Sequence, residues 1–140
     1  MLGRVGLGRS NPNLLAVNIQ EQLVRRVGEV VRRVIAELPA DLRTLAERVP
    51  VFCEWEMAEH WLEEGVADDS MGLFSGSALN EPTDPGCLES PSITFFLAEL
   101  WDYCGEDLPT FDKEVRITYI HEFGHYLGLN ESELEARGLL

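Results

Sequence analysis

The residues best suited to chemistry lie near the C-terminus, where a His-Glu-x-x-His motif begins at His121. On a helix, His121 and His125 lie one turn apart on the same face, so their imidazoles can bind one metal ion. Glu122 lies about 100° further round the helix, where it can take a proton from a metal-bound water. Gly128 can end the helix with a positive φ, and Glu131 follows that turn with a carboxylate. The pattern predicts a catalytic zinc site made of two histidines, one carboxylate and a water.

Two other acidic residues, Glu133 and Glu135, are rivals for the third ligand position. We favour Glu131 because it needs the shortest turn after Gly128. The alternative to a metal site is a buried helix whose histidines happen to be four residues apart. That alternative does not explain why the general base, the glycine and the following acid are all at the positions that zinc chemistry needs.

Two further residues are weaker candidates: His60 because it is a third histidine, and Tyr126 because it follows the motif directly. His60 could add to the metal site, but nothing in the sequence places it near His121, so we predict an ordinary surface or half-buried histidine. Tyr126 lies one turn beyond Glu122 and could stabilise an oxyanion, although a packing role is favoured. Neither residue is needed for the predicted chemistry.

The motif must be carried by a helix, and the residues before it agree. Residues 111–120 have helical character, with Pro109-Thr110 as the entry and Asp112 and Glu114 in the expected first turn. Apolar residues occur on both sides of the histidine face, which predicts a mostly buried helix that is open along one cleft. Gly124 lies beside that cleft and permits another backbone to approach closely.

A second long helix is predicted near the N-terminus. Asn18 begins a capping-box pattern, and about 20 residues with apolar side chains at helical spacing follow until Pro39. Arginines occupy the opposite side. We expect the apolar stripe to pack on the sheet of the domain, because a domain this small needs that surface. A helix that binds a partner or a membrane surface is the alternative.

The remaining elements are short. We expect a helix or turn at 41–48, strands at 49–55, 72–76 and 92–97, a turn-rich loop at 80–86, and a helical region that ends at Gly105. The segment 57–64 is ambiguous. After Glu131 a short terminal helix is expected. Together these elements predict an α+β (α/β) fold, in which a small mixed sheet packs with the N-terminal helix and the central zinc helix.

The run from His121 to Glu131 resembles the extended zinc motif of metzincins, with a glutamate in the place of the third histidine. It is more similar still to the small bacterial minimal zincins, a zincin-like metallopeptidase family with an acidic third ligand. Segments at 38–42, 49–51, 72–76 and 91–96 extend the resemblance to residues 18–135. Unlike metzincins, the chain has no methionine downstream of the motif for a Met-turn.

The resemblance implies a zinc-dependent peptidase in which Glu122 is the general base and His121, His125 and Glu131 bind the metal. It also implies that an edge strand beside the zinc helix pairs with the extended backbone of the substrate. Either 73–77 or 93–97 could be that strand, and the sequence does not decide between them.

Length and composition fit a single domain. The chain has 140 residues, of which 45% are hydrophobic, and we divide it into a flexible tail at 1–17 and one domain at 18–140. No stretch of 18 apolar residues is present, so no membrane partner is expected. The N-terminus lacks the apolar core of a signal peptide, which favours a cytoplasmic protein. Three widely spaced cysteines predict reduced thiols rather than disulfides.

The net charge of −14 is unevenly distributed. Residues 1–48 contain eight arginines and five acids, whereas residues 49–112 contain fifteen acids and no Lys or Arg. Residues 113–140 contain three basic and five acidic residues. An acidic surface repels phosphate backbones, so no nucleic-acid partner is expected. It favours a basic substrate segment, or it only aids solubility.

The sequence therefore predicts a zinc metallopeptidase that acts on a peptide or protein substrate. One alternative keeps the metal fold but has weak or no catalysis, as a binding or regulatory module. Another is a metal-dependent RNA-processing hydrolase, against which the acidity of the chain argues. The oligomeric state and the substrate do not follow from the sequence.

Overall fold

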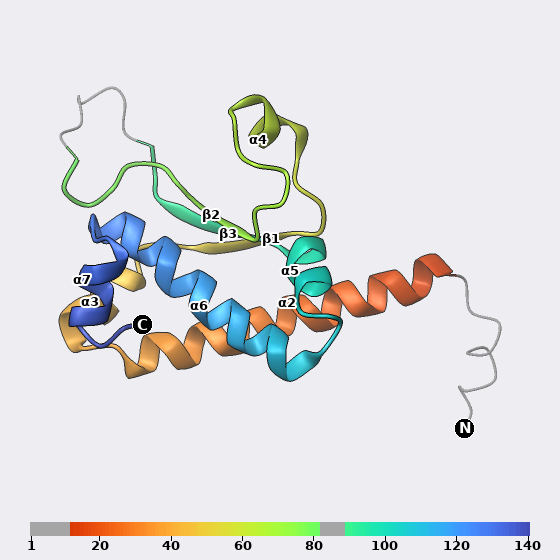
Figure 1. The fold of residues 1–140 in the computed structure, drawn as a ribbon, viewed down its shortest axis with the longest axis horizontal. Helices are drawn as coiled ribbons and strands as arrows, with labels where there is room; N and C mark the ends of the chain where they lie inside the picture. Colours follow the sequence, from red (N-terminus) through yellow and green to blue (C-terminus); the bar gives the residue numbers. More distant parts are fainter. Residues whose placement is uncertain (1–11, 82–88) are drawn as a thin grey trace.

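The computed structural model describes residues 12–81 and 89–140, with side chains from residue 18 onward. Three short strands and six helices in these ranges form an α+β fold, which confirms the predicted class (Figure 1). In chain order the elements are α2 (Pro12–Glu37), α3 (Ala40–Ala46), β1 (Val51–Glu54), α4 (Glu59–Glu63), β2 (Gly72–Ser75), β3 (Ser92–Phe96), α5 (Leu97–Tyr103), α6 (Leu108–Leu127) and α7 (Glu131–Ala136).

The three strands form one mixed sheet in the order β1-β3-β2. The central strand β3 pairs with β1 in parallel and with β2 in antiparallel, and Phe74 of β2 lies opposite Ile93. Because β3 has a neighbour on each side, the segment 93–97 cannot pair with a substrate. Of the two candidate segments, the one that begins at Leu73 therefore contains the edge strand.

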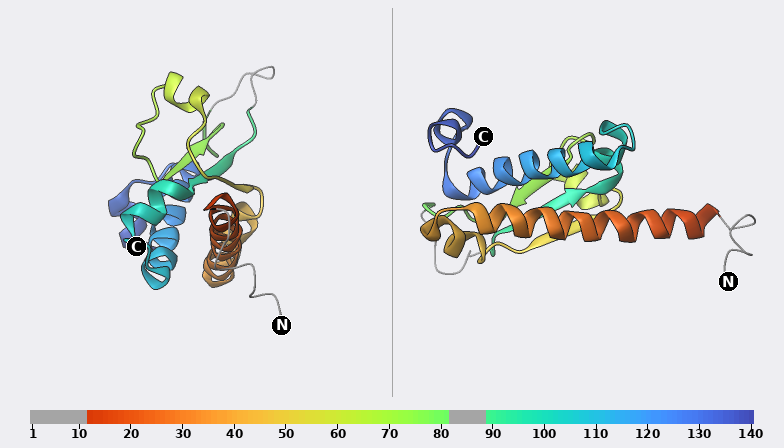
Figure 2. Two further views of the ribbon diagram at one scale, coloured as in Figure 1. Left: turned by 90° about the vertical axis from the view of Figure 1, so that its right-hand side faces the viewer. Right: turned by 90° about the horizontal axis from the view of Figure 1, so that it is seen from below.

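Helices α2 and α6 lie side by side along one face of the sheet (Figure 2). A bidentate ion pair joins them, in which Arg26 Nε and Nη2 donate to Asp112 at 3.0 and 2.7 Å. The apolar stripe of α2 is buried. Among the other elements, α6 makes the most extensive contact with this helix. The stripe thus contributes to the core, although its main partner is α6 and not the sheet that the sequence predicted.

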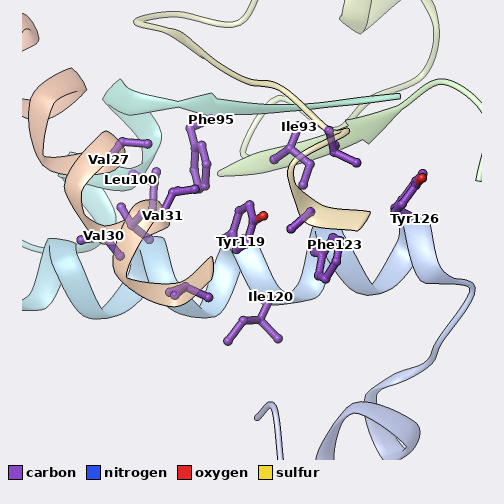
Figure 3. Packing of buried hydrophobic residues seen from close by; sticks show 14 of the residues in the cluster. Val27, Val30, Val31, Ile93, Phe95, Leu100, Tyr119, Ile120, Phe123 and Tyr126 are labelled. Atoms are coloured by element: carbon purple, nitrogen blue, oxygen red, sulfur yellow. The ribbon is translucent and has the colours of Figure 1, made fainter. Parts of the chain in front are cut away.

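The buried core lies directly beneath the motif-bearing half of α6. Tyr119 projects from this helix toward the sheet (Figure 3), and its ring is stacked with that of Phe123 with centroids 5.9 Å apart. Both side chains are almost completely buried, as is Phe95 of β3. Burial raises the pKa of Tyr119 to about 12, so its hydroxyl stays protonated at neutral pH. This residue is part of the structural support of the helix.

Two predicted helix starts are wrong. Helix α2 begins at Pro12 and not at Asn18, and the first helical position suits proline because its missing N–H would have no partner there. Helix α6 begins at Leu108 after the N-cap Asp107, so Asp112 and Glu114 lie beyond its first turn. The division into tail and domain stays a prediction, because residues 1–11 lie outside the described part.

The short elements follow the sequence closely. Helix α3 and all three strands occur where they were expected, and the ambiguous segment 57–64 contains the short helix α4. Most of the predicted loop at 80–86 lies outside the described residues. Within residues 12–81 and 89–140, no helix has the length and apolar character needed to cross a membrane.

The cysteines agree with the prediction as far as the structure describes them. Cys53 and Cys104 are free thiols, and Cys87 lies outside the described residues. Burial raises the pKa of both described thiols to about 11, so both are protonated at neutral pH. Neither has the low pKa of a reactive cysteine.

Candidate active site

The turn at Gly128 directs the chain back toward the histidines. This glycine has a φ of 75°, a conformation that other residues adopt only with strain. The N–H of Leu129 donates to the carbonyl of Gly124 at 2.9 Å, and the N–H of Gly128 donates to that of His125 at 3.1 Å. These bonds satisfy the last carbonyls of α6 and fix the direction in which the chain leaves. The predicted role of Gly128 is confirmed.

A second helix starts immediately after this turn. Asn130 caps α7 through a complete capping box, because its Oδ1 accepts from the N–H of Glu133 at 2.9 Å and Glu133 Oε1 accepts from the N–H of Asn130 at 3.1 Å. Leu134 is the one buried residue of α7. It packs on Gly124, where an added Cβ would lie 2.8 Å from its Cδ1 atom. Gly124 therefore makes room for the side chain of Leu134. The prediction that another backbone approaches this glycine closely is wrong.

This arrangement brings Glu131 to the first histidine of the motif. His121 Nε2 lies 2.6 Å from Glu131 Oε1, a short hydrogen bond to a carboxylate. Of the rival acids, Glu133 uses its carboxylate in the capping box, and no hydrogen bond or ion pair joins the Glu135 side chain to the motif among the described residues. The turn thus places the residue that the sequence favoured.

Glu122 lies between the helix and the edge strand. Its Oε1 atom accepts a hydrogen bond of 2.8 Å from the backbone N–H of Phe74 in β2 and lies 3.2 Å from His125 Nδ1. The side chain is only 14% exposed, compared with 62% for His125. The backbone of β2 therefore fixes the orientation of this carboxylate. No pattern in the sequence predicts this contact directly, although the glycine-bounded strand was a candidate neighbour of the helix.

Two hollows flank the histidines. The larger one, of about 640 Å³, is lined by Phe74, Leu129 and Leu134 together with His121, His125 and Glu131. The smaller one, of about 300 Å³, lies toward the start of β2, where Gly72 and Thr118 line it beside the same two histidines and Glu122. The motif is thus accessible from a cleft that continues on both sides, as the burial pattern of α6 predicted.

The donor atoms at the cleft fit zinc by their chemistry. Imidazole nitrogens and a carboxylate are ordinary zinc ligands, and His121, His125 and Glu131 all line one hollow. In this structure the side chains pair with one another, and no group of three or more His, Cys, Asp or Glu among the described residues is arranged around a single point. Two neighbouring ligands of tetrahedral zinc are roughly 3.3 Å apart, given bonds of about 2.0 Å. The contact of 2.6 Å is therefore a direct hydrogen bond between two side chains that both suit the metal.

The weaker candidates are absent from this site. His60 is exposed on α4, where its ring lies 4.3 Å from that of Trp61, and it lines neither hollow. Tyr126 is buried, and its ring packs near those of Phe74 and Phe123. Both outcomes agree with the favoured predictions.

Comparison with known proteins supports the family suggested by the motif. A family model described as zincin-like metallopeptidase matches residues 46–139, which is more than half of the chain. The chain belongs to this family. The matched residues include all three strands, the helix α6 and the turn to α7. Helix α2 lies outside the matched residues. No curated protein is similar enough to this zincin-like metallopeptidase to count as a match.

Proposed function

We propose that this zincin-like metallopeptidase hydrolyses peptide bonds with a zinc ion held by His121, His125 and Glu131. The observation that carries the proposal is the contact of 2.6 Å between His121 and Glu131, which join across the Gly128 turn in the hollow that His125 also lines. Residues from two helices would not need to meet there for packing alone, because both side chains are partly or largely exposed.

When bound, zinc would polarise the carbonyl of the substrate and make water a stronger nucleophile near neutral pH. Glu122 would take the proton of that water and later give it to the leaving amine. Both described contacts of this carboxylate involve Oε1, so Oε2 is the atom that would receive the proton. The N–H of Phe74 would hold the carboxylate in place during both transfers.

The edge of β2 is the proposed binding place for the substrate backbone. Of the two antiparallel strands, β2 is the outer one, and the outward N–H of Phe74 already meets the general base. An extended peptide along this edge would lie directly above the two histidines, with the cleft continuing on both sides. Strand addition of this kind fixes a substrate through its main chain, and pockets then select side chains. A peptide or protein is therefore the proposed partner, and the acidity of the chain argues against nucleic acid.

Two substitutions test the assignment of roles. Glu122→Ala should keep zinc and lose turnover by a factor of at least about 100, because general acid–base catalysis contributes about 10²–10⁴-fold. His121→Ala should lose zinc itself. Metal content by mass spectrometry, together with chelator-sensitive cleavage of a peptide library, measures both effects. Full activity of Glu122→Ala would refute its role as the base.

A binding or regulatory module without useful catalysis is the second candidate. The feature in its favour is the length of 140 residues, which leaves little room for walls around the side chains of a substrate. Zinc uptake alone does not distinguish the two functions, because both use the same ligands. Cleavage of library peptides that stops on adding chelator would favour the enzyme, whereas zinc binding without any cleavage would favour the module.

A further inference from the structure

The two hollows beside the histidines differ in charge. The larger hollow is lined by the carboxylates of Glu81, Glu131 and Glu133, whereas Glu122 is the one acidic residue that lines the smaller hollow. No Lys or Arg lines either hollow among the residues that the structure describes. The half of the cleft on the α7 side is therefore the more acidic one.

The acidic half also has an apolar floor. Phe74, Leu129 and Leu134 line the larger hollow from three different segments, and Leu134 is almost completely buried. Glu81 and Glu133 are exposed, so their carboxylates lie nearer to solvent than this floor. A long side chain with an apolar stem and a cationic head matches this combination, because the stem covers apolar surface while the head stays near water. Lysine and arginine have this form.

One of the two carboxylates is also held in place. Glu133 Oε1 accepts the hydrogen bond from the N–H of Asn130 that completes the capping box. A carboxylate that is already ordered loses less side-chain entropy when a cation binds beside it. The charge at this end of the cleft is thus a fixed feature of the start of α7.

From these observations we infer that the cleft selects peptides that carry lysine or arginine on the α7 side of the scissile bond. The inference rests on the proposed function, because it places the scissile bond at His121 and His125. It adds a substrate class, namely peptides with a basic side chain in the larger hollow.

Binding of labelled peptides tests the inference without any need for turnover. The probes are three fluorescent hexapeptides that differ at one position, which is lysine, norleucine or glutamate, and the protein is the full chain with Glu122→Gln and added zinc. We expect the lysine peptide to bind most tightly and the glutamate peptide least tightly. Adding Glu81→Gln and Glu133→Gln should weaken binding of the lysine peptide about fivefold and leave the norleucine peptide unchanged.

The design separates a local effect from the general acidity of the protein. Glutamine can replace glutamate in a capping box, so Glu133→Gln removes a charge and keeps the start of α7. The matched control is Glu59→Gln with Glu63→Gln, which removes two charges from exposed residues of α4 that line neither hollow. Equal losses in the two double variants, equal binding of the lysine and norleucine peptides, or no binding of any probe would overturn the inference.

A cleavage experiment distinguishes failure of this inference from failure of the proposed function. Cleavage of a peptide library by the unsubstituted chain, mapped by mass spectrometry, gives the residues on each side of every cut. Chelator-sensitive cleavage without a preference for basic residues would refute the substrate class and keep the peptidase. Selective binding of the lysine peptide without cleavage would keep the substrate class for the site and refute hydrolysis.

Discussion

The two helices that meet at the candidate site are supported very differently. Helix α6 has eight buried residues along its 20 positions, whereas α7 has six residues and buries one of them, Leu134. His121 and Glu122 belong to the first helix and are 34% and 14% exposed, and Glu131 belongs to the second and is 72% exposed. The two histidines and the proposed base are thus on a helix that the core holds, while the third proposed ligand is held by a cap, one leucine and its own bond to His121.

The proposed metal site would thus combine two parts of this small domain that are supported unequally. The proposed general base Glu122 needs a fixed direction, and it obtains one from the buried helix and from the backbone of β2. A carboxylate ligand on a short exposed helix can adjust when an ion binds, at little cost to the rest of the fold. Substitutions that weaken each helix separately should therefore differ in their cost in unfolding free energy and in how much of the domain they destabilise.

The largest effect is expected from the core beneath α6. Phe123→Ala removes a ring that is 2% exposed and stacked on Tyr119, and such substitutions cost about 3–5 kcal/mol of unfolding free energy. Chemical denaturation should show this loss for the whole domain together with loss of zinc binding. Phe52→Ala is the matched control, because Phe52 is 54% exposed on β1. An equal loss in both variants would contradict the assignment of the core.

A smaller and more local effect is expected from the contact under α7. Leu134→Ala removes the leucine that packs on Gly124, and we expect a loss of about 2 kcal/mol, at the low end for a buried leucine. Hydrogen exchange should become faster in α7 and stay slow in α6, and zinc affinity should fall about tenfold because Glu131 is less ordered. Leu62→Ala, at a leucine that is 44% exposed on α4, is the control. Equally fast exchange in both helices would show that they unfold together.

Much of the site could be predicted from the sequence because the signals were local. The four-residue spacing of His121 and His125, and the glycine that ends their helix, each depend on a few neighbouring residues. The spacing of Asn130 and Glu133 is that of a capping box and is equally local, although it was not among the predictions made from the sequence. The family match over residues 46–139 agrees with the motif. Local patterns of this kind are readable without knowledge of the tertiary structure.

The rest depended on contacts between distant residues. Nothing in the neighbourhood of Phe74 indicates that its N–H meets a carboxylate 48 residues further along the chain. The edge position of β2 follows from pairing among three short strands, which periodicity does not order. The start of α6 was misplaced because Asp112 resembles a first-turn acid, whereas its carboxylate serves a long-range ion pair with Arg26. These errors concern tertiary structure and boundaries, and the chemistry of the motif is unaffected.

The smallest expected effect compares the N-caps of the two helices. Hydrogen bonds from the hydroxyl and then the N–H of Thr110 hold the pKa of Asp107, the cap of α6, below its ordinary value of 3.8. Because the folded pKa is the lower one, this contribution to stability is present above the ordinary pKa and is lost as pH falls through the folded value.

Asparagine caps equally well without titrating in this range. Asp107→Asn should therefore reduce the acid-dependent loss of stability, and Asn130→Asp in the cap of α7 should introduce one. Urea denaturation between about pH 2 and pH 5 measures both slopes, and a slope unchanged by Asp107→Asn would show that other carboxylates account for the acid sensitivity.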